Sequence, residues 1–181
     1  MNSAIILAAG KGERLKSKIP KQFLEIHKNK KILDFSVEAF NNNNLINEII
    51  IVVKSKWIDE IKKHYSAFQV VVGGETRSAS SFNGLQNCSN SCSKVLIHDA
   101  ARPFLNKQII DECIKKLDNY DAVVPVLNVS DSIINKDKKY LNREEIKLIQ
   151  TPQSFHYLEL INAYKKYKLG TDDLSVYLKY N

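Results

Sequence analysis

The sequence predicts an α/β fold: a Rossmann-like, mostly parallel sheet with helices on both faces. Apolar runs of strand length recur along the first two thirds of the chain, and amphipathic helical patterns separate them. Glycine-rich turns follow two of these runs. Because a parallel sheet is covered on both faces, its strands are apolar throughout rather than alternating. The order of the two patterns therefore indicates one sheet packed between two layers of helices.

The regular elements follow one another in strict alternation. The predicted strands are residues 4–9, 48–53, 68–72, 94–98 and 122–126. The predicted helices run through residues 33–40, 57–65, 79–85 and 109–117. The last of these has the clearest amphipathic pattern, and Asn106 is its expected N-cap.

The alternation stops after the fifth predicted strand. Residues 130–155 contain short apolar runs around a polar stretch, which we interpret as paired strands in an arm that projects from the domain. A helix at residues 158–164 returns to the core, and Thr171 is the expected cap of a last short helix. Residues 1–181 are thus expected to form one domain with a projecting arm.

The composition is that of an ordinary globular protein, with 181 residues, 44% hydrophobic and 26% charged. The net charge of +7 comes from 27 Lys and Arg against 20 Asp and Glu. Lysine pairs at 62–63, 115–116 and 165–166 follow helical patterns, where they are typical of solvated faces. The sequence has no Arg-rich tract and no basic strand interleaved with aromatics, so small anionic molecules explain the charge at least as well as nucleic acid. We expect no nucleic-acid partner.

Three cysteines without C-x-x-C spacing argue against a disulfide framework and against a structural zinc site. Cys113 lies on the apolar stripe of a predicted helix and is expected in the core. No apolar run is long enough to cross a membrane, and the start of the chain lacks a signal peptide's basic region. These features predict a cytoplasmic protein that is neither exported nor embedded in a membrane.

The first predicted strand leads into a glycine-rich loop at residues 10–14. Its glycines allow the backbone to approach a bulky anion, and Lys11, Arg14 and the nearby Lys21 offer cations to a polyphosphate. The loop is not a dinucleotide fingerprint, because a third glycine is absent and Lys54 rather than an acidic residue follows the second strand. It is not a Walker loop either, since neither Ser nor Thr follows its Gly-Lys pair.

Residues 7–14, Leu-Ala-Ala-Gly-Lys-Gly-Glu-Arg, and the string Pro20-Lys21-Gln22 resemble the signature of sugar-phosphate nucleotidyltransferases. Further strings occur in the order seen in the 2-C-methyl-D-erythritol 4-phosphate cytidylyltransferase family. They are Gly73-Gly74-Glu75-Thr76-Arg77 with Ser80, His98-Asp99-Ala100-Ala101-Arg102-Pro103, Asp131-Ser132, Gln150-Thr151-Pro152-Gln153 and Thr171-Asp172-Asp173. The resemblance spans almost the whole chain.

The resemblance implies an enzyme of isoprenoid precursor synthesis. A phosphate oxygen of methylerythritol phosphate attacks the α-phosphorus of CTP and pyrophosphate leaves, with no covalent enzyme intermediate. The protein must position two anions in line and neutralise charge on the pentacoordinate phosphorus, a task for fixed cations and Mg²⁺. Arg14 and Lys21 are the expected catalytic residues.

The resemblance also implies a nucleotide-binding set, which is Ala8, Ala9, Gly10, Lys11, Gly12, Gly74, Ser80 and Asp99. Ser80 is expected to hydrogen-bond the cytosine; alternatively it is a helix-face serine. Asp99, at the carboxyl end of the fourth strand, is expected to hold Mg²⁺ or to orient a phosphate, and the alternative is a structural pair with Arg102. The alternative for Lys11 is a solvated loop lysine.

In the family the arm reaches across a homodimer. The candidates for binding the alcohol phosphate are Arg102, Ser132, Arg143 and Thr151. Arg143 suits a bidentate phosphate clamp, and its alternative is a surface pair with Glu144 or Glu145. The alternative for Thr151 is a strand-end hydroxyl. His98 is expected to be a hydrogen-bonded strand-end histidine rather than a base, because a phosphate nucleophile needs no base near neutral pH.

Three departures from the family pattern are present. The sequence stops at Asn181, where the family continues through a strand and a helix that carries a substrate-contacting lysine, so we expect weakened or absent activity. His27-Lys28 replaces a glycine turn, and Ser132 replaces a threonine. Two other functions are left open: ribitol 5-phosphate cytidylyltransferase, and a catalytically incomplete CTP-binding domain.

Overall fold

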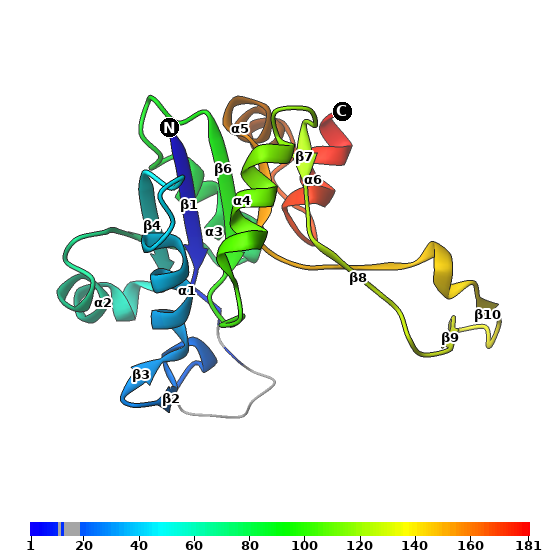
Figure 1. The fold of residues 1–181 in the computed structure, drawn as a ribbon, viewed down its shortest axis with the longest axis horizontal. Helices are drawn as coiled ribbons and strands as arrows, with labels where there is room; N and C mark the ends of the chain where they lie inside the picture. The colour runs from blue at the N-terminus through cyan, green and yellow to red at the C-terminus, as the bar shows by residue number, and fades with distance from the viewer. Residues whose placement is uncertain (11, 13–18) are drawn as a thin grey trace.

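A six-stranded sheet forms the centre of the protein. The computed structural model describes residues 1–10, 12 and 19–181, and its sheet has the strand order β5-β4-β1-β6-β12-β7 (Figure 1). The strands in that order are Gln69–Val72, Glu48–Val53, Asn2–Leu7, Lys94–Asp99, Gln153–His156 and Ala122–Val123. β5, β4, β1 and β6 run parallel, and β12 is antiparallel to both of its neighbours. The predicted Rossmann-like, mostly parallel sheet is confirmed.

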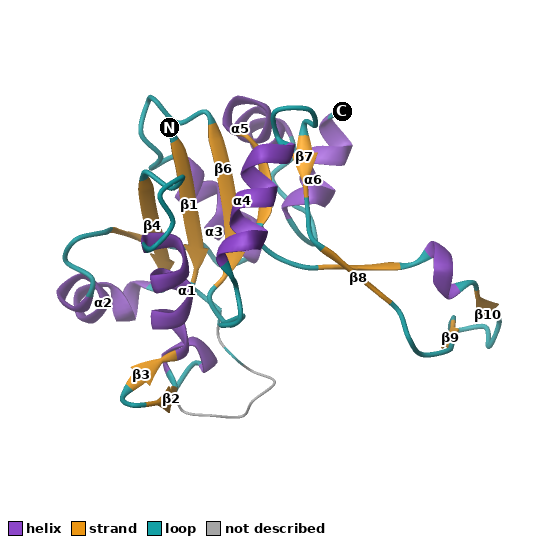
Figure 2. Cartoon of the chain, viewed as in Figure 1, coloured by secondary structure: helices purple, strands orange, loops and turns teal. Residues whose placement is uncertain are grey.

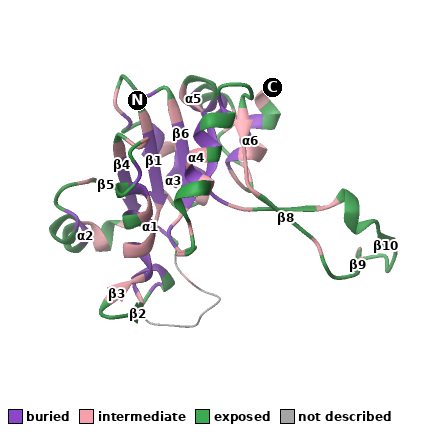
Figure 3. Ribbon diagram, in the orientation of Figure 1, coloured by how far each residue is buried: buried purple, intermediate pink, exposed green. Residues whose placement is uncertain are grey.

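Helices cover both faces of this sheet (Figure 2). On one face pack α1 (Ile32–Asn41), α2 (Ile58–His64) and α4 (Lys107–Lys116). On the other pack α3 (Arg77–Leu85), α5 (Tyr157–Lys166) and α6 (Asp173–Tyr180). Side chains alternate across a strand, so Ala4 and Ile6 of β1 enter the first core and Ile5 enters the second. Both faces of β1 are therefore buried, as its apolar sequence predicts (Figure 3).

The helix caps confirm one prediction and correct another. Asn106 caps α4, because its Oδ1 accepts a hydrogen bond of 2.9 Å from the amide of Ile109. Thr171 does not cap α6. The cap is Asp172, whose carboxylate accepts 2.8 Å from the amide of Ser175 in a capping box. Asp173 directly follows this cap as the first residue of α6, and its side chain is fully buried.

The predicted strand at residues 122–126 is wrong in its second half. Only Ala122–Val123 joins the sheet as β7, and Val126–Asn128 forms β8, which already belongs to the arm. The sequence analysis also missed β12, which returns from the arm and pairs between β6 and β7. The sequence of β12, Gln-Ser-Phe-His, has a single apolar residue and therefore lacks the apolar run that predicted the other strands.

The arm projects from the edge of the sheet (Figure 1). At its root β8 pairs with β11 (Lys147–Ile149), and at its tip β9 (Ile133–Ile134) pairs with β10 (Tyr140–Leu141). A 3-10 turn, η4 (Arg143–Glu145), lies between β10 and β11. The paired strands span residues 126–149 rather than the expected 130–155, because β12 belongs to the sheet.

The smaller elements are η2 (Lys21–Phe23), the two-stranded pair β2 (Glu25–His27) and β3 (Lys30–Lys31), and η3 (Ser55–Trp57). Cys113 is buried in the first core, as predicted. Cys88, Cys92 and Cys113 are free thiols. Within the described part of the chain, no helix combines the length and the apolar character needed to span a bilayer.

His98 lies near the carboxyl end of β6 and is only 1% exposed. Its Nε2 lies 3.1 Å from the carbonyl oxygen of Arg102, and its Nδ1 lies 2.9 Å from Oγ1 of Thr151. The ring of Phe40 packs edge-on against it, with centroids 5.6 Å apart. Burial lowers the pKa of His98 to about 4, because the charged imidazolium would lose its water. These contacts agree with the interpretation of His98 as a hydrogen-bonded strand-end histidine.

This histidine makes folding stability depend on pH. Below about pH 6.5 the unfolded chain protonates His98 while the folded chain does not, so its contribution is complete above that pH and is lost as pH falls toward 4. The expected loss at pH 4 is about 3 kcal/mol. Urea unfolding of wild type and His98→Gln between pH 7 and pH 4 measures it, since the variant lacks this titration. Equal pH slopes in the two proteins would contradict the prediction.

Candidate active site

A pocket of about 900 Å³ opens at the carboxyl ends of β1, β4 and β6. In parallel α/β sheets this edge is where ligands bind. The residues that line the pocket are Leu7, Ala9, Gly10, Gly12, Lys21, Gln22, Lys54, Gly74, Glu75, Thr76, Arg77, Ser80, Asp99, Ala101 and Arg102. Most of the predicted nucleotide-binding residues are therefore brought together, although they come from separate segments.

The loop that follows β1 is held by Gln22. Its Nε2 donates to the carbonyl oxygen of Ala8 at 2.6 Å and to that of Gly10 at 2.9 Å, and the Gln22 side chain is buried. Gly12 has a φ of +68°, the left-handed region that favours glycine. The backbone at Ala8 and Gly10 is thus held beside the pocket before any ligand binds. Sequence reasoning missed this role of Gln22, although Pro20-Lys21-Gln22 was recognised as part of the motif.

The predicted catalytic pair is described only in part. Lys21 begins η2, is exposed and lines the pocket. Arg14 and Lys11 lie outside the described residues. The pocket therefore contains at least one of the cations that were expected to meet a polyphosphate.

The turn that leads into α3 closes another side of the pocket. A Cβ on Gly74 would lie 2.4 Å from Cβ of Ala79, so this close approach requires glycine. The Ser80 hydroxyl accepts from the amide of Gly74 at 3.2 Å and donates to the carbonyl oxygen of Thr76 at 2.9 Å. Ser80 thus lines the pocket, as expected, and its contacts also shape the turn that carries Gly74.

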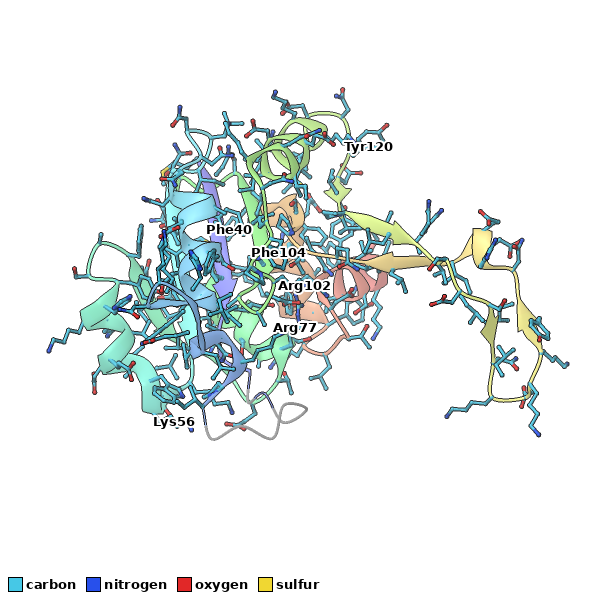
Figure 4. The ribbon with its side chains drawn as sticks, turned by 60° about the horizontal axis from the view of Figure 1, so that its bottom comes forward. Phe40, Lys56, Arg77, Arg102, Phe104 and Tyr120 are labelled. Carbon is cyan, nitrogen blue, oxygen red and sulfur yellow. The ribbon has the colours of Figure 1, made fainter. Side chains whose placement is uncertain are left out.

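Asp99 forms ion pairs with two arginines, Arg77 and Arg102, which Figure 4 labels. Its Oδ1 is 3.1 Å from Nε of Arg77, and its Oδ2 is 3.4 Å from Nε of Arg102. The pair of Asp99 with Arg102, which was the alternative to a ligand role, is therefore present. Arg77 was not among the predicted site residues, although it ends the string of residues 73–77. The sequence does not reveal which strand end its side chain contacts.

Arg77 also extends away from the pocket to a buried carboxylate. Its Nη1 lies 2.7 Å from Oδ2 of Asp173. Asp173 is fully buried, and its Oδ1 accepts a hydrogen bond of 2.6 Å from the hydroxyl of Tyr164. Burial opposes the charge on Arg77, but the carboxylates of Asp173 and Asp99 outweigh it and raise its pKa. Burial and the charge of Asp173 likewise raise the pKa of Tyr164. Arg77 is therefore a permanent cation held between two anions.

Two more charged residues reach the pocket without having been predicted as site residues. Lys54 directly follows β4, and its Nζ lies 3.7 Å from Oε2 of the exposed Glu75. In the sequence, Lys54 only argued against a dinucleotide fingerprint. Its position at a strand end was the available signal, because strand ends of a parallel sheet share one edge.

The predicted substrate-binding residues fall into two groups. Thr151 is nearly buried behind the pocket, where its Oγ1 contacts His98 and accepts 3.3 Å from the amide of Asp99. The peptide bond between Thr151 and Pro152 is cis. Arg102 lines the pocket itself. Both residues therefore belong to the same strand end as Asp99.

Ser132 and Arg143 lie on the exposed arm and not at the pocket of their own chain. Arg143 Nη1 donates 2.7 Å to the carbonyl oxygen of Ser130, and its Nε lies 3.5 Å from Oε1 of Glu144. The surface pair with Glu144 that was the alternative for Arg143 is therefore present. Within one chain, the structure does not bring these two residues to the other candidates.

The acidic groups are too dispersed to form a protein-only metal cage. In residues 1–10, 12 and 19–181 no group of three or more His, Cys, Asp or Glu could hold a metal ion. Asp99 is the carboxylate at the pocket that was predicted to hold one. The arrangement suits the binding of a polyanion by lysine, arginine and backbone amides.

The comparisons with known proteins agree on one family. The family model of 2-C-methyl-D-erythritol 4-phosphate cytidylyltransferase (IspD) matches residues 2–180. A protein of that name from Thermotoga neapolitana is 43% identical over 180 residues, which cover 96% of this chain and 81% of the relative. One from Clostridium botulinum strain 657 is 39% identical, with 99% and 84% covered.

Solved structures give the same result. The 4-diphosphocytidyl-2C-methyl-D-erythritol synthase of Anaerococcus prevotii is 29% identical with a TM-score of 0.86, and the match covers 99% of this chain and 82% of that one. The bifunctional IspDF of Campylobacter jejuni is 30% identical with a TM-score of 0.88, and the match covers 98% of this chain and 47% of that one. This chain belongs to the 2-C-methyl-D-erythritol 4-phosphate cytidylyltransferase family.

Proposed function

We propose that this chain transfers the cytidylyl group of CTP to 2-C-methyl-D-erythritol 4-phosphate and releases pyrophosphate, a reaction of isoprenoid precursor synthesis. The observation that carries the proposal is the family match over residues 2–180, together with one pocket at which three of the family's motifs meet. Gly12 and Lys21, Gly74, and Asp99 with Arg102 line this pocket. The relatives and solved structures reported above that name a substrate name methylerythritol, which disfavours ribitol 5-phosphate as the acceptor.

The reaction is an in-line displacement at phosphorus. A phosphate oxygen of methylerythritol phosphate forms a bond to the α-phosphorus of CTP, while the bond from that phosphorus to the oxygen bridging the β-phosphorus breaks. The nucleophile is already anionic near neutral pH, so the step requires no general base. The contribution of the protein is to hold the two anions together and to neutralise the charge that builds up on the α-phosphate.

The residues divide this work. Lys21, and Arg14 in the preceding loop, neutralise the α-phosphate. The backbone of residues 8–12 with Gly74 and Ser80 holds the nucleotide, and Lys11 adds a cation. Arg102 and Thr151, from the strand end that carries Asp99, bind the alcohol phosphate. The contacts that hold Ala8, Gly10 and Asp99 support the roles of these segments, because they place the groups before the ligand arrives.

Mg²⁺ fits this pocket through Asp99. Each carboxylate oxygen accepts one hydrogen bond from an arginine and keeps a further lone pair, and the side chain is 32% exposed. With one carboxylate at hand, the phosphates would supply most of the ligands, which is the usual arrangement for Mg²⁺ on nucleotides. When bound, the ion supplies charge neutralisation to the triphosphate. Asp99 would hold it, and Arg77 and Arg102 keep the carboxylate oriented.

A second copy of this chain is the proposed partner of the arm. Apolar side chains that are exposed in the single chain gather along it: Val126, Leu127, Ile134, Tyr140, Leu141, Leu148 and Ile149. An apolar surface of this kind is typical of a protein interface. In a homodimer, Ser132 and Arg143 would bind the alcohol phosphate in the pocket of the neighbouring subunit. The free thiols of all three cysteines agree with a cytoplasmic location.

The decisive assay is pyrophosphate release from CTP and Mg²⁺, with methylerythritol 4-phosphate and ribitol 5-phosphate supplied separately. We expect release with the first substrate and little with the second. Release with ribitol 5-phosphate alone would replace the acceptor. CTP binding without release in either reaction would contradict the proposed activity and favour a binding domain.

Lys21→Ala is expected to lower kcat by a factor of about 100 to 1,000, because the variant loses a cation that meets the transition state. Lys63→Ala is the matched control, since Lys63 is exposed on α2 and does not line the pocket. Steady-state kinetics and a thermal melt of each protein separate catalysis from folding. Wild-type turnover in Lys21→Ala would contradict the catalytic role of Lys21.

Shared sites can be tested with mixed dimers of a Lys21→Ala subunit and an Arg143→Ala subunit. One of the two pockets then has both native residues, so about half of the wild-type activity should return, while each variant alone stays impaired. Heterodimers purified with two different affinity tags provide the measurement. Activity no higher than that of the separate variants would argue against a pocket completed by the partner's arm.

A further inference from the structure

One contact connects the pocket to the root of the arm. Arg102 lies in the loop after β6 and lines the pocket, and its side chain is 44% exposed. Its Nη1 donates a hydrogen bond to Oε1 of Gln150, and its Nε lies 3.4 Å from Oδ2 of Asp99. Gln150 itself is not a lining residue of the pocket.

Gln150 is held in place from both strands of the arm's root. Its Nε2 donates to the carbonyl oxygens of Leu148 and Ile149, at 3.1 Å each. Its backbone amide donates 2.8 Å to the carbonyl oxygen of Pro125, which directly precedes β8. The amide group is therefore oriented by the arm, so that its oxygen is the atom presented to Arg102.

The two contacts of Arg102 leave part of its guanidinium available. An arginine has five N–H donors in a planar fork. In Arg102 the donor on Nε and one donor on Nη1 make the two contacts. No described residue accepts a hydrogen bond from Nη2. The contact with Asp99 is long and would not define the plane of the fork by itself. The contact with Gln150 supplies the second point that orients the fork.

We propose that Gln150 is a positioning residue for the alcohol phosphate: it orients Arg102 so that the remaining N–H groups of the guanidinium face the phosphate of that substrate. The inference rests on the proposed function, which assigns that phosphate to Arg102. A neutral amide suits the task, because it accepts the hydrogen bond without cancelling the charge that attracts the phosphate. A carboxylate at this position would hold Arg102 equally well but would compete with the substrate.

The proposal predicts an effect on one substrate only. Gln150→Met keeps the length of the side chain and removes the acceptor. We expect the KM for methylerythritol 4-phosphate to rise about tenfold, which corresponds to one lost orienting contact, while the KM for CTP changes less than about twofold. Gln108→Met is the matched control, since Gln108 is exposed on α4 and its amide donates only to Glu112. An equal rise of both KM values in Gln150→Met would indicate general damage to the pocket and would overturn the proposal.

A double-mutant cycle with Arg102→Ala separates positioning from a merely structural role. If Gln150 acts through Arg102, Gln150→Met should raise the KM for methylerythritol 4-phosphate in the wild-type background and leave it unchanged in the Arg102→Ala background. Equal effects in the two backgrounds would overturn the proposal. Gln150→Leu serves if Gln150→Met does not fold, because it also removes the acceptor that orients Arg102. It should also raise the KM for the alcohol phosphate alone, and an unchanged value would contradict the inference.

Measurements on the wild-type protein separate a failure of the proposed function from a failure of the proposed role of Gln150. Absence of turnover with methylerythritol 4-phosphate in wild type would count against the proposed function. The role of Gln150 is then read from calorimetric titration of wild type and variants with methylerythritol 4-phosphate, which needs no turnover. A Kd about tenfold weaker in Gln150→Met, and unchanged in Gln108→Met, is the expected result. Equal Kd values for wild type and Gln150→Met would overturn the inference.

Discussion

The ion pair between Arg77 and the buried Asp173 is the constraint on which the arrangement of the site depends. A carboxylate without solvent contact requires a paired cation, and Arg77 supplies it from the first residue of α3. The same guanidinium binds Asp99 at the end of β6. One side chain thus connects the last helix, the helix after the glycine turn and the central strand that carries Asp99. The pocket owes its shape to elements that are far apart in sequence.

The elements that could be predicted are those whose signals are local. β1 and β4 are continuous apolar runs, and α4 has both an apolar stripe and an asparagine cap, so each was recognised without knowledge of its neighbours. β12 could not be recognised, because Gln-Ser-Phe-His has only one apolar residue and its place between β6 and β7 is set by tertiary pairing. The cap of α6 was misplaced by one residue because Thr171 and Asp172 are both good caps.

The residues of the candidate site likewise fall into those that local motifs predict and those that only the structure identifies. Gly10, Gly12, Lys21, Gly74, Ser80, Asp99 and Arg102 were predicted from motifs, and all of them line one pocket. Gln22 and Arg77 act through hydrogen bonds to other segments. A sequence motif does not specify the direction in which a side chain points. Gln150 stood in a recognised string, but its importance depends on the geometry of the arm's root. Residues that position others therefore need the structure to be identified.

β7 and β12 flank the arm in the sequence and pair with each other in the sheet. These strands are antiparallel neighbours, with Val123 opposite Ser154, so the segment between them is topologically the loop of a β-hairpin. Loops of this kind tolerate large changes of length, because the entropy of closing them grows only slowly with size. The arm can accordingly lengthen, shorten or change its sequence during evolution while the six-stranded sheet keeps its order. The arm and the architecture of the pocket can then vary largely as separate modules, which meet where Gln150 contacts Arg102.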